Sequence, residues 1–212
     1  ADLKDRLSAT AQIIAKGDEN YSAKFNWAYL AYELTNELTV KGGRFRTPLF
    51  IYSDFLDVGY AYHWISPPES VYNLSGFDST DGVMLEHITD FGGWSSMLAF
   101  IAGATRSDLE LGTLDSTDAL TLSWSLSYDW FTFHAVHSES EVTIDADQFA
   151  LLAEGLGGMG VSQAAIDGLL MESDHAAFDG LGVAIDTGTF FAVTEFTRIA
   201  TEDAFPADPA ET

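Results

Sequence analysis

The sequence contains no cysteine, few basic residues and no long apolar run. Without cysteine, the chain has no disulfide, no thiolate metal site and no thiol nucleophile. Nine Lys and Arg residues against 33 Asp and Glu residues give a net charge of −24. This charge excludes nucleic acid as a partner, because phosphate binding needs a basic surface. Since no apolar stretch approaches the ~18 residues of a membrane-spanning helix, a helical membrane protein is excluded as well.

The chain does contain short segments in which apolar and polar residues alternate. The clearest is 119–128, where Leu120, Leu122 and Trp124 alternate with Thr and Ser. This pattern indicates a strand with one apolar face and one hydroxyl-bearing face. The sequence predicts nine strands, at 6–15, 24–34, 37–46, 81–89, 94–105, 119–128, 130–138, 178–186 and 189–200.

The connectors between these segments alternate between tight turns and longer loops. This order is typical of an up-and-down β-barrel across an outer membrane, with turns on one side and loops on the other. We therefore predict a single all-β domain over 1–212, an antiparallel transmembrane β-barrel, with one or two short helices at 147–171 and a loop at 106–117. Nine strands cannot close such a barrel, which predicts that the domain is incomplete. If the count is one too high, eight strands could close alone.

Aromatic residues gather beside the predicted tight turns. They are Trp94, Tyr128, Trp130, Phe190 and Phe191. Rings at these positions are typical of the aromatic girdle at a membrane interface. The same rings could instead form the core of a two-sheet sandwich, and the order of the connectors favours the barrel.

The run GGRFRTPLFIYSDFLDVGYAYHWISPPESVYN, preceded by WAYLAYELTNELTVK, resembles the corresponding region of Gram-negative outer-membrane porins, particularly those of marine gammaproteobacteria. The later FDGLGVAIDTGTFFAVTEFTR also resembles a porin hairpin. The resemblance implies a barrel of about 16 strands, usually a homotrimer, through which small hydrophilic solutes diffuse passively. The chain departs from that family in lacking the closing strands and the terminal aromatic residue.

The resemblance also implies a loop that folds into the barrel, with acidic residues on the loop facing basic residues on the wall. The predicted constriction residues are Arg44, Arg46, Asp54, Asp57 and Glu69. The two arginines share one strand face, and the acids lie on the 47–80 excursion. Opposed charges would give the passage a transverse field that sorts solutes by charge and size. Alternatively, the arginines pair with acids for stability or lie at a membrane interface.

Nothing in the sequence indicates catalysis. His134 and His137 point to opposite faces of a predicted strand, which spoils them as a metal pair, and no nucleophile motif is present. We expect no enzyme activity, no cofactor and no metal centre. The acidic segment 139–175 has no Lys or Arg; it can gather divalent cations beside lipopolysaccharide, although a solvated face is the simpler interpretation. Two other hypotheses remain open: a secreted β-sandwich that binds carbohydrate, and a membrane barrel with a structural or receptor role.

Overall fold

The structure is a computed structural model that describes residues 2–15, 23–55, 68–72, 77–109, 112–145, 147–162 and 173–201. Its strands are β1 (Asp2–Lys4), β2 (Leu7–Ala15), β3 (Ala23–Glu33), β4 (Leu38–Arg46), β5 (Ser79–Phe91), β6 (Trp94–Leu109), β7 (Gly112–Tyr128), β8 (Phe131–Asp145), β9 (Asp174–Asp186) and β10 (Phe191–Thr201). Its helices are a 3-10 turn (Ser53–Phe55), α1 (Glu69–Tyr72) and α2 (Asp147–Gly158).

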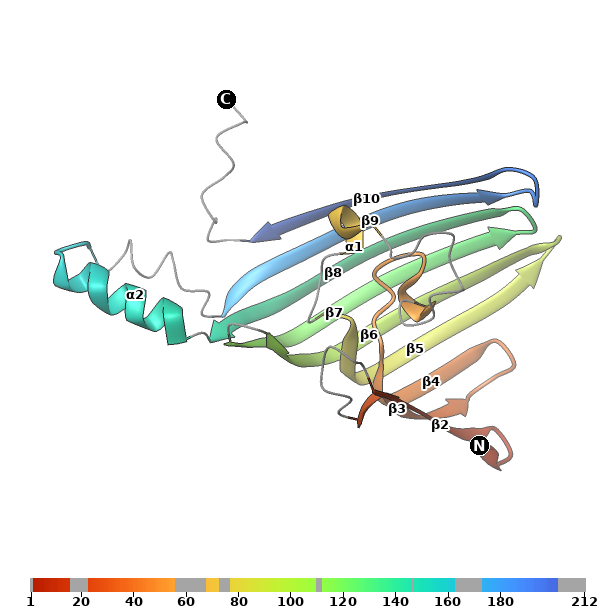
Figure 1. Ribbon diagram of the computed structural model, residues 1–212. Coiled ribbons are helices and arrows are strands. Elements are labelled where there is room, and N and C mark those ends of the chain that lie inside the picture. Colours follow the sequence, from red (N-terminus) through yellow and green to blue (C-terminus); the bar gives the residue numbers. More distant parts are fainter. Residues whose placement is uncertain are drawn as a thin grey trace.

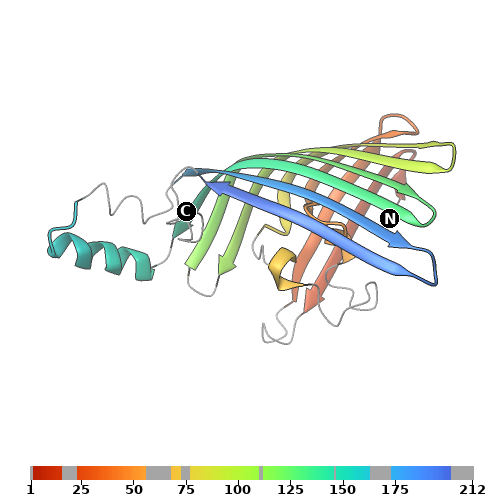
Figure 2. The ribbon, with the colours of Figure 1, turned by 90° about the horizontal axis from the view of Figure 1, so that it is seen from above.

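The ten strands form one antiparallel sheet in which each strand pairs with its neighbours in the chain (Figure 1). This confirms the all-β prediction, and nine of the strands correspond to the nine predicted ones. The tenth is β1, which is too short for its alternation to be recognised in the sequence. The described strands make a single curved sheet, with β1 and β10 at the two ends of its order (Figures 1 and 2).

The loop predicted at 106–117 is wrong, because β6 and β7 continue through most of it as a long hairpin. Thr105 pairs with Ser116 and Leu109 with Gly112. A shift in register after Thr117, with Asp118 at a φ of +50°, absorbs the irregularity and lets the pairing continue. The segment looks like a loop in the sequence because Gly, hydroxyl and acidic residues interrupt the apolar alternation, although Leu114 is buried. β8 likewise continues to Asp145, well beyond the predicted end at 138, and buries Val142.

In the middle of β7 the two faces are inverted relative to an ordinary globular protein. Between Thr121 and Trp124 the hydroxyl-bearing residues are buried and the apolar ones are exposed: Thr121 is 2% exposed and Leu122 is 49% exposed. We call the face that carries Thr121 the inner face and the face that carries Leu122 the outer face. The strand register extends both faces across the neighbouring strands, where the inner face buries apolar residues such as Met84 and Ile101 as well as polar ones.

Described residues between β4 and β5, among them Leu49, Phe50 and Tyr72, cover part of the inner face. Figure 2 shows α1, the helix of this connection, on the concave side of the sheet. One apolar cluster, of Phe45, Met84, Ala99 and Ile101, lies on the inner side of β4 to β6. A second cluster joins the connection to β8 and β9, and it holds the candidate functional site.

Helix α2 follows β8 directly and confirms the short helix predicted within 147–171. It lies beyond the end of the sheet (Figure 1), and Leu151 and Leu152 on it are exposed. No helix in the described part of the chain is both long and apolar enough to cross a membrane.

Candidate functional site

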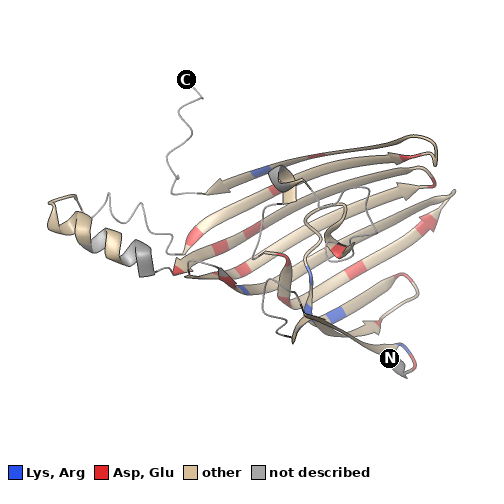
Figure 3. Ribbon diagram, in the orientation of Figure 1, with Lys and Arg blue, Asp and Glu red and all other residues tan. Residues whose placement is uncertain are grey.

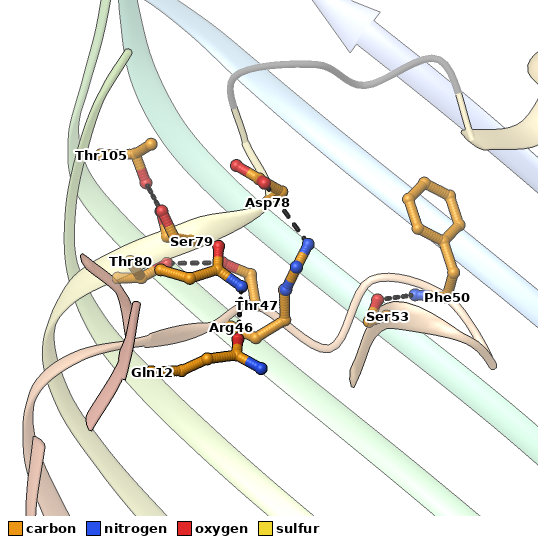
Figure 4. Close-up of polar contacts among 10 residues, drawn as sticks. Gln12, Arg46, Thr47, Phe50, Ser53, Asp78, Ser79, Thr80 and Thr105 are labelled. Atoms are coloured by element: carbon orange, nitrogen blue, oxygen red, sulfur yellow. Dashed lines mark hydrogen bonds and ion pairs between the residues drawn. The ribbon is translucent and has the colours of Figure 1, made fainter. Parts of the chain in front are cut away.

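The connection between β4 and β5 is closed at its base by two contacts. The amide of Thr47 donates to the carbonyl of Asp78 over 3.1 Å, and the hydroxyls of Thr47 and Thr80 lie 2.7 Å apart. Arg46 also pairs with Asp78, its Nη1 lying 3.4 Å from Oδ2 (Figure 4). The two strands therefore hold both ends of the connection together, and we call the part between them, residues 47–78, the inner loop.

From the end of β4 the inner loop crosses the inner face toward β8 and β9, where apolar side chains anchor it. Leu49 and Phe50 are buried against Val136 of β8 and Phe178 of β9. The Phe50 ring lies 4.6 Å from the ring of Tyr72 and 5.8 Å from that of Phe178, centroid to centroid. Because β4 and β8 are separated by β5, β6 and β7, this segment bridges the inner face rather than leaving the sheet at its edge.

A single carboxylate on β10 holds the inner loop at two points. Glu195 accepts a hydrogen bond from the amide of Ile51 over 3.2 Å and another from the hydroxyl of Tyr72 in α1. Burial, together with the neighbouring Glu195, raises the pKa of the Tyr72 phenol above its ordinary range, so the phenol is a neutral donor. Charge-assisted bonds of this kind are among the stronger ones in proteins. Glu195 thus holds the inner loop at Ile51 and at Tyr72, and we call these two hydrogen bonds the Glu195 clasp.

Two glycines on β9 provide the space in which the loop lies. A Cβ atom added at Gly182 would lie 2.7 Å from Cδ1 of Ile51, and one added at Gly180 would lie 2.7 Å from Cγ1 of Val136 and 3.3 Å from the carbonyl oxygen of Leu49. Such distances are shorter than van der Waals contact, so any side chain here would displace the loop. The glycines therefore serve the close approach of the loop to β9.

His134 completes the anchoring from β8. Its Nε2 lies 3.2 Å from the carbonyl oxygen of Pro48, and its Nδ1 lies 2.9 Å from the hydroxyl of Ser125. The ring is 3% exposed and lies on the inner face, whereas His137 is on the outer face beside Asp179, with 2.8 Å between Nδ1 and Oδ1. This confirms the prediction that the two histidines point to opposite faces.

Charged residues of both signs lie under the first part of the inner loop. Nζ of Lys41 lies 2.8 Å from Oε2 of Glu86 across β4 and β5 on the inner face. Asp54 keeps exposed surface, yet desolvation by the surrounding protein raises its pKa above the usual range, and Lys41 and Arg46 oppose part of that rise. The loop acid and two wall bases are therefore close enough to influence one another electrostatically.

The structure separates the predicted constriction residues. Arg46 is 5% exposed and pairs with Asp78, and its charge opposes part of the rise in the pKa of Asp54. Arg44 shares the outer face with Leu85, and its Nε lies 2.8 Å from Oδ1 of Asp81. Both arginines therefore pair with an acid, which is the alternative stated for them. Their place in a constriction stays a prediction.

Two predicted constriction acids remain. Glu69 is the first residue of α1, and Asp57 lies outside the described residues.

Glu195 and Lys41 belong to the site but were not identified from the sequence. Each has a signal in the sequence, since Glu195 is an isolated acid within strand 191–201 and Lys41 shares its strand face with Phe45, opposite Arg44.

The predicted aromatic residues meet at the tight-turn ends of the strands. The ring of Trp94 lies 4.9 Å from that of Tyr128 and 6.1 Å from that of Phe131, and Trp130 lies 6.0 Å from Phe131, centroid to centroid. Trp130 and Phe190 remain exposed. The aromatic side chains therefore gather along one end of the sheet.

Within the described ranges, no three His, Asp or Glu side chains are grouped so that they could hold a metal ion. The arrangement is instead that of a curved wall with a loop clasped across its inner side. No family model matches the chain, and no curated protein or solved structure matches it either.

Proposed function

We propose that this chain forms the wall of an outer-membrane diffusion channel, with the inner loop narrowing the passage. The observation that carries the proposal is the row of large apolar groups exposed on the outer side of the sheet, while the inner side buries hydroxyl groups together with apolar ones. A water-soluble protein gains stability by the opposite arrangement. In a barrel whose lumen holds water and whose outside meets lipid, the observed arrangement is the favourable one.

The outer face supplies a continuous apolar band. In register across three strands, Leu85 lies beside Phe100, and Phe100 beside Leu122. Other large apolar side chains exposed on this face are Leu30, Val83, Leu98, Leu120, Trp124, Leu181 and Phe196. Exposed apolar patches on soluble monomers rarely exceed a few hundred Å². A band that runs from β3 to β10 therefore favours contact with lipid.

Acidic residues lie at both ends of the strands. Figure 3 shows them on β7, β8 and β9 toward α2 and also at the opposite end, where Asp90, Asp129 and Asp186 lie. The aromatic rings gather beside the tight turns, and a barrel of this kind has its short turns on the periplasmic side and its longer connections outside. We therefore place the α2 end outside the cell, in contact with lipopolysaccharide, where the acidic residues can attract divalent cations.

The outer face also carries polar residues: Arg44 pairs with Asp81 on β4 and β5, and a larger group lies on β8, β9 and β10. His137 contacts Asp179 and Glu139, and Arg198 is the register partner of Asp179. Uncompensated charges facing lipid are costly, so we place the contact between copies of the proposed homotrimer here. Closing the barrel also requires partners for the outer edges of β1 and β10, because unpaired backbone groups in lipid cost several kcal/mol each. A barrel of about 16 strands, as the family resemblance implies, satisfies this requirement.

The inner loop gives the proposed channel its selectivity. Asp54 on the loop and Lys41 and Arg46 on the wall place opposite charges across the passage, and the field between them orients water and dipolar solutes. The solutes are small and hydrophilic, and they move down their own gradients. No chemical step is involved.

Conductance in a planar lipid bilayer tests this function. We expect discrete ion-conducting steps from the full-length protein extracted in detergent, together with a heat-dependent shift in gel mobility. Stable barrels without conductance would point to a structural or receptor role. A protein that stays soluble without detergent and shows no mobility shift would contradict the membrane barrel.

Ion selectivity distinguishes the three basic residues of β4. Replacing Lys41 or Arg46 with Gln should raise the preference for cations, because each removes a positive charge from the passage. A unit charge about 10 Å from an ion in water contributes ~0.4 kcal/mol, so the permeability ratio should change about twofold. Arg44→Gln is the matched control, since Arg44 lies on the outer face with Asp81. An equal effect of all three substitutions in reversal-potential measurements would contradict this assignment.

The ion selectivity should also depend on pH through Asp54. Because the pKa of Asp54 is raised, its negative charge is lost at a higher pH than that of an ordinary aspartate. The preference for cations should therefore begin to decrease at a higher pH than the titration of ordinary carboxylates would give. Asp54→Asn should begin with the weaker preference and lack this step. Identical pH profiles for the two proteins would show that Asp54 does not face the passage.

A further inference from the structure

A cavity of about 70 Å³ lies on the inner face between the inner loop and the strands β5 to β10. It has room for roughly five water molecules, or for one edge of a larger solute. Its lining is rich in hydroxyl groups, and these include Thr47, Thr80, Thr105, Ser116, Thr121 and Ser138. They come from the loop and from four neighbouring strands, so the cavity exists only in the folded sheet.

The hydroxyl groups are arranged in close pairs. Oγ1 of Thr121 lies 2.6 Å from Oγ of Ser138, and the Thr47 and Thr80 hydroxyls lie 2.7 Å apart. Thr105 donates to the carbonyl of Ser79 over 2.8 Å (Figure 4). Each hydroxyl has one donor and two acceptor positions, so a pair that shares one bond keeps one donor and several acceptors. Such a pair can rotate to meet either a donor or an acceptor of a bound molecule.

The remaining lining is apolar and includes two aromatic rings. Phe77 of the inner loop and Phe178 of β9 both line the cavity, with Leu49 between the loop and the wall. Binding sites for small molecules combine such apolar surface with a few polar groups that fix orientation. The cavity therefore suits a molecule that carries both C–H surface and hydroxyl groups.

Charge restricts the class of molecule further. Among the described residues, no side chain that lines the cavity is ionisable. Arg46, the base at the foot of the loop, is already engaged with Asp78. An anion would thus lack a partner within the cavity, and a cation would lack a counter-charge, so an uncharged molecule loses least on leaving water.

We propose that this cavity is a binding site for one edge of an uncharged sugar or polyol. Its hydroxyl groups would bond with the Thr121–Ser138 and Thr47–Thr80 pairs, and its C–H face would lie against Phe178 and Phe77. This inference rests on the proposed function, because it assigns a solute class to the proposed passage. Because Thr47, Leu49 and Phe77 line the cavity, the inner loop would both narrow the passage and form part of a weak binding site for the solute.

Binding of D-glucose to the full-length protein in detergent tests the inference, with D-gluconate as the anionic comparison. Saturation-transfer NMR should detect glucose, strongest at its ring C–H protons. The double variant Thr121→Val with Ser138→Ala removes both hydroxyls of one pair and should weaken glucose binding at least about fivefold. Ser123→Ala is the matched control, because Ser123 lies on the same face of β7 outside the cavity lining. Its binding should equal that of the wild type.

A second variant guards against a folding defect in the first. Ala119 lines the cavity, and Ala119→Leu should fill part of it and weaken glucose binding while the heat-dependent mobility stays unchanged. Equal glucose binding by the wild type, the double variant and Ala119→Leu would overturn the site, and so would gluconate binding as tight as that of glucose. Conductance without glucose binding would leave the proposed function intact and remove this inference. Glucose binding without conductance would keep the cavity as a sugar site but contradict the proposed channel.

Discussion

Replacing Phe100 with arginine should destabilise the folded protein in a bilayer by about 2 to 4 kcal/mol. Phe100 is 47% exposed on the outer face, flanked in register by Leu85 and Leu122. If this face meets lipid, the substitution moves a charge from water into hydrocarbon. If the face meets water, the same substitution at a half-exposed position should change stability by no more than about 0.5 kcal/mol. Unfolding by denaturant in lipid vesicles measures the difference.

Phe55→Arg provides the matched control. Phe55 is 50% exposed, so residue type and exposure are nearly equal, but it lies in the 3-10 turn of the inner loop. We expect a change within about 0.5 kcal/mol there, because the loop faces water inside the proposed channel. Equal effects at the two positions would contradict an outer face in contact with lipid.

Glu195→Ala should release the inner loop from the wall and widen the passage. The substitution removes the acceptor of two hydrogen bonds, from Ile51 and Tyr72, and bonds to charged groups are worth about 1.5 to 3 kcal/mol. Local opening of the loop should therefore become more than tenfold more frequent. Hydrogen exchange at the Ile51 amide should accelerate accordingly, and the single-channel conductance should increase.

Two further variants separate the clasp from a general loss of stability. Glu195→Gln keeps one oxygen acceptor, so its exchange rate should fall between those of the wild type and the Ala variant. Gly182→Val keeps the Glu195 carboxylate but puts a side chain against Ile51 and within 3.2 Å of Cγ of Glu195, and it should accelerate exchange at the same amide. Protection of Ile51 that is unchanged in all three variants would show that the loop is held by its apolar anchor alone.

The strands and their order were predictable because both depend on local pattern. Alternation located the strand cores, and turn sequences separated them. The ends of β6, β7 and β8 were missed because polar and acidic residues interrupt the alternation there, whereas register with the neighbouring strands and the burial of Leu114 and Val142 maintain the pairing. β1 was missed because a strand as short as Asp2–Lys4 has too few residues to show an alternation.

The candidate site was predicted only in part. Acids on the loop and bases on strand 38–46 were identified, and Arg46 proves to pair with Asp78 at the foot of the loop. Glu195 could not be assigned a role, because its partners lie far away in the sequence and meet it only when the sheet curves. The hydroxyl pairs of the cavity were hidden for the same reason, since each pair joins residues of different strands or loops.

The segment from Val40 to Asn73 shows most clearly which features the sequence determined and which ones only the tertiary structure decided. By itself the sequence determined that Arg44 and Lys41 lie on opposite faces of one strand, because side chains alternate along any extended backbone. Only the tertiary structure decided which of these faces is the inner one, placing Lys41 beside Glu86 and Arg44 beside Asp81. It also decided that the inner loop crosses to β8, β9 and β10, because the glycine space, the apolar cluster and the Glu195 clasp form only when distant strands are brought side by side.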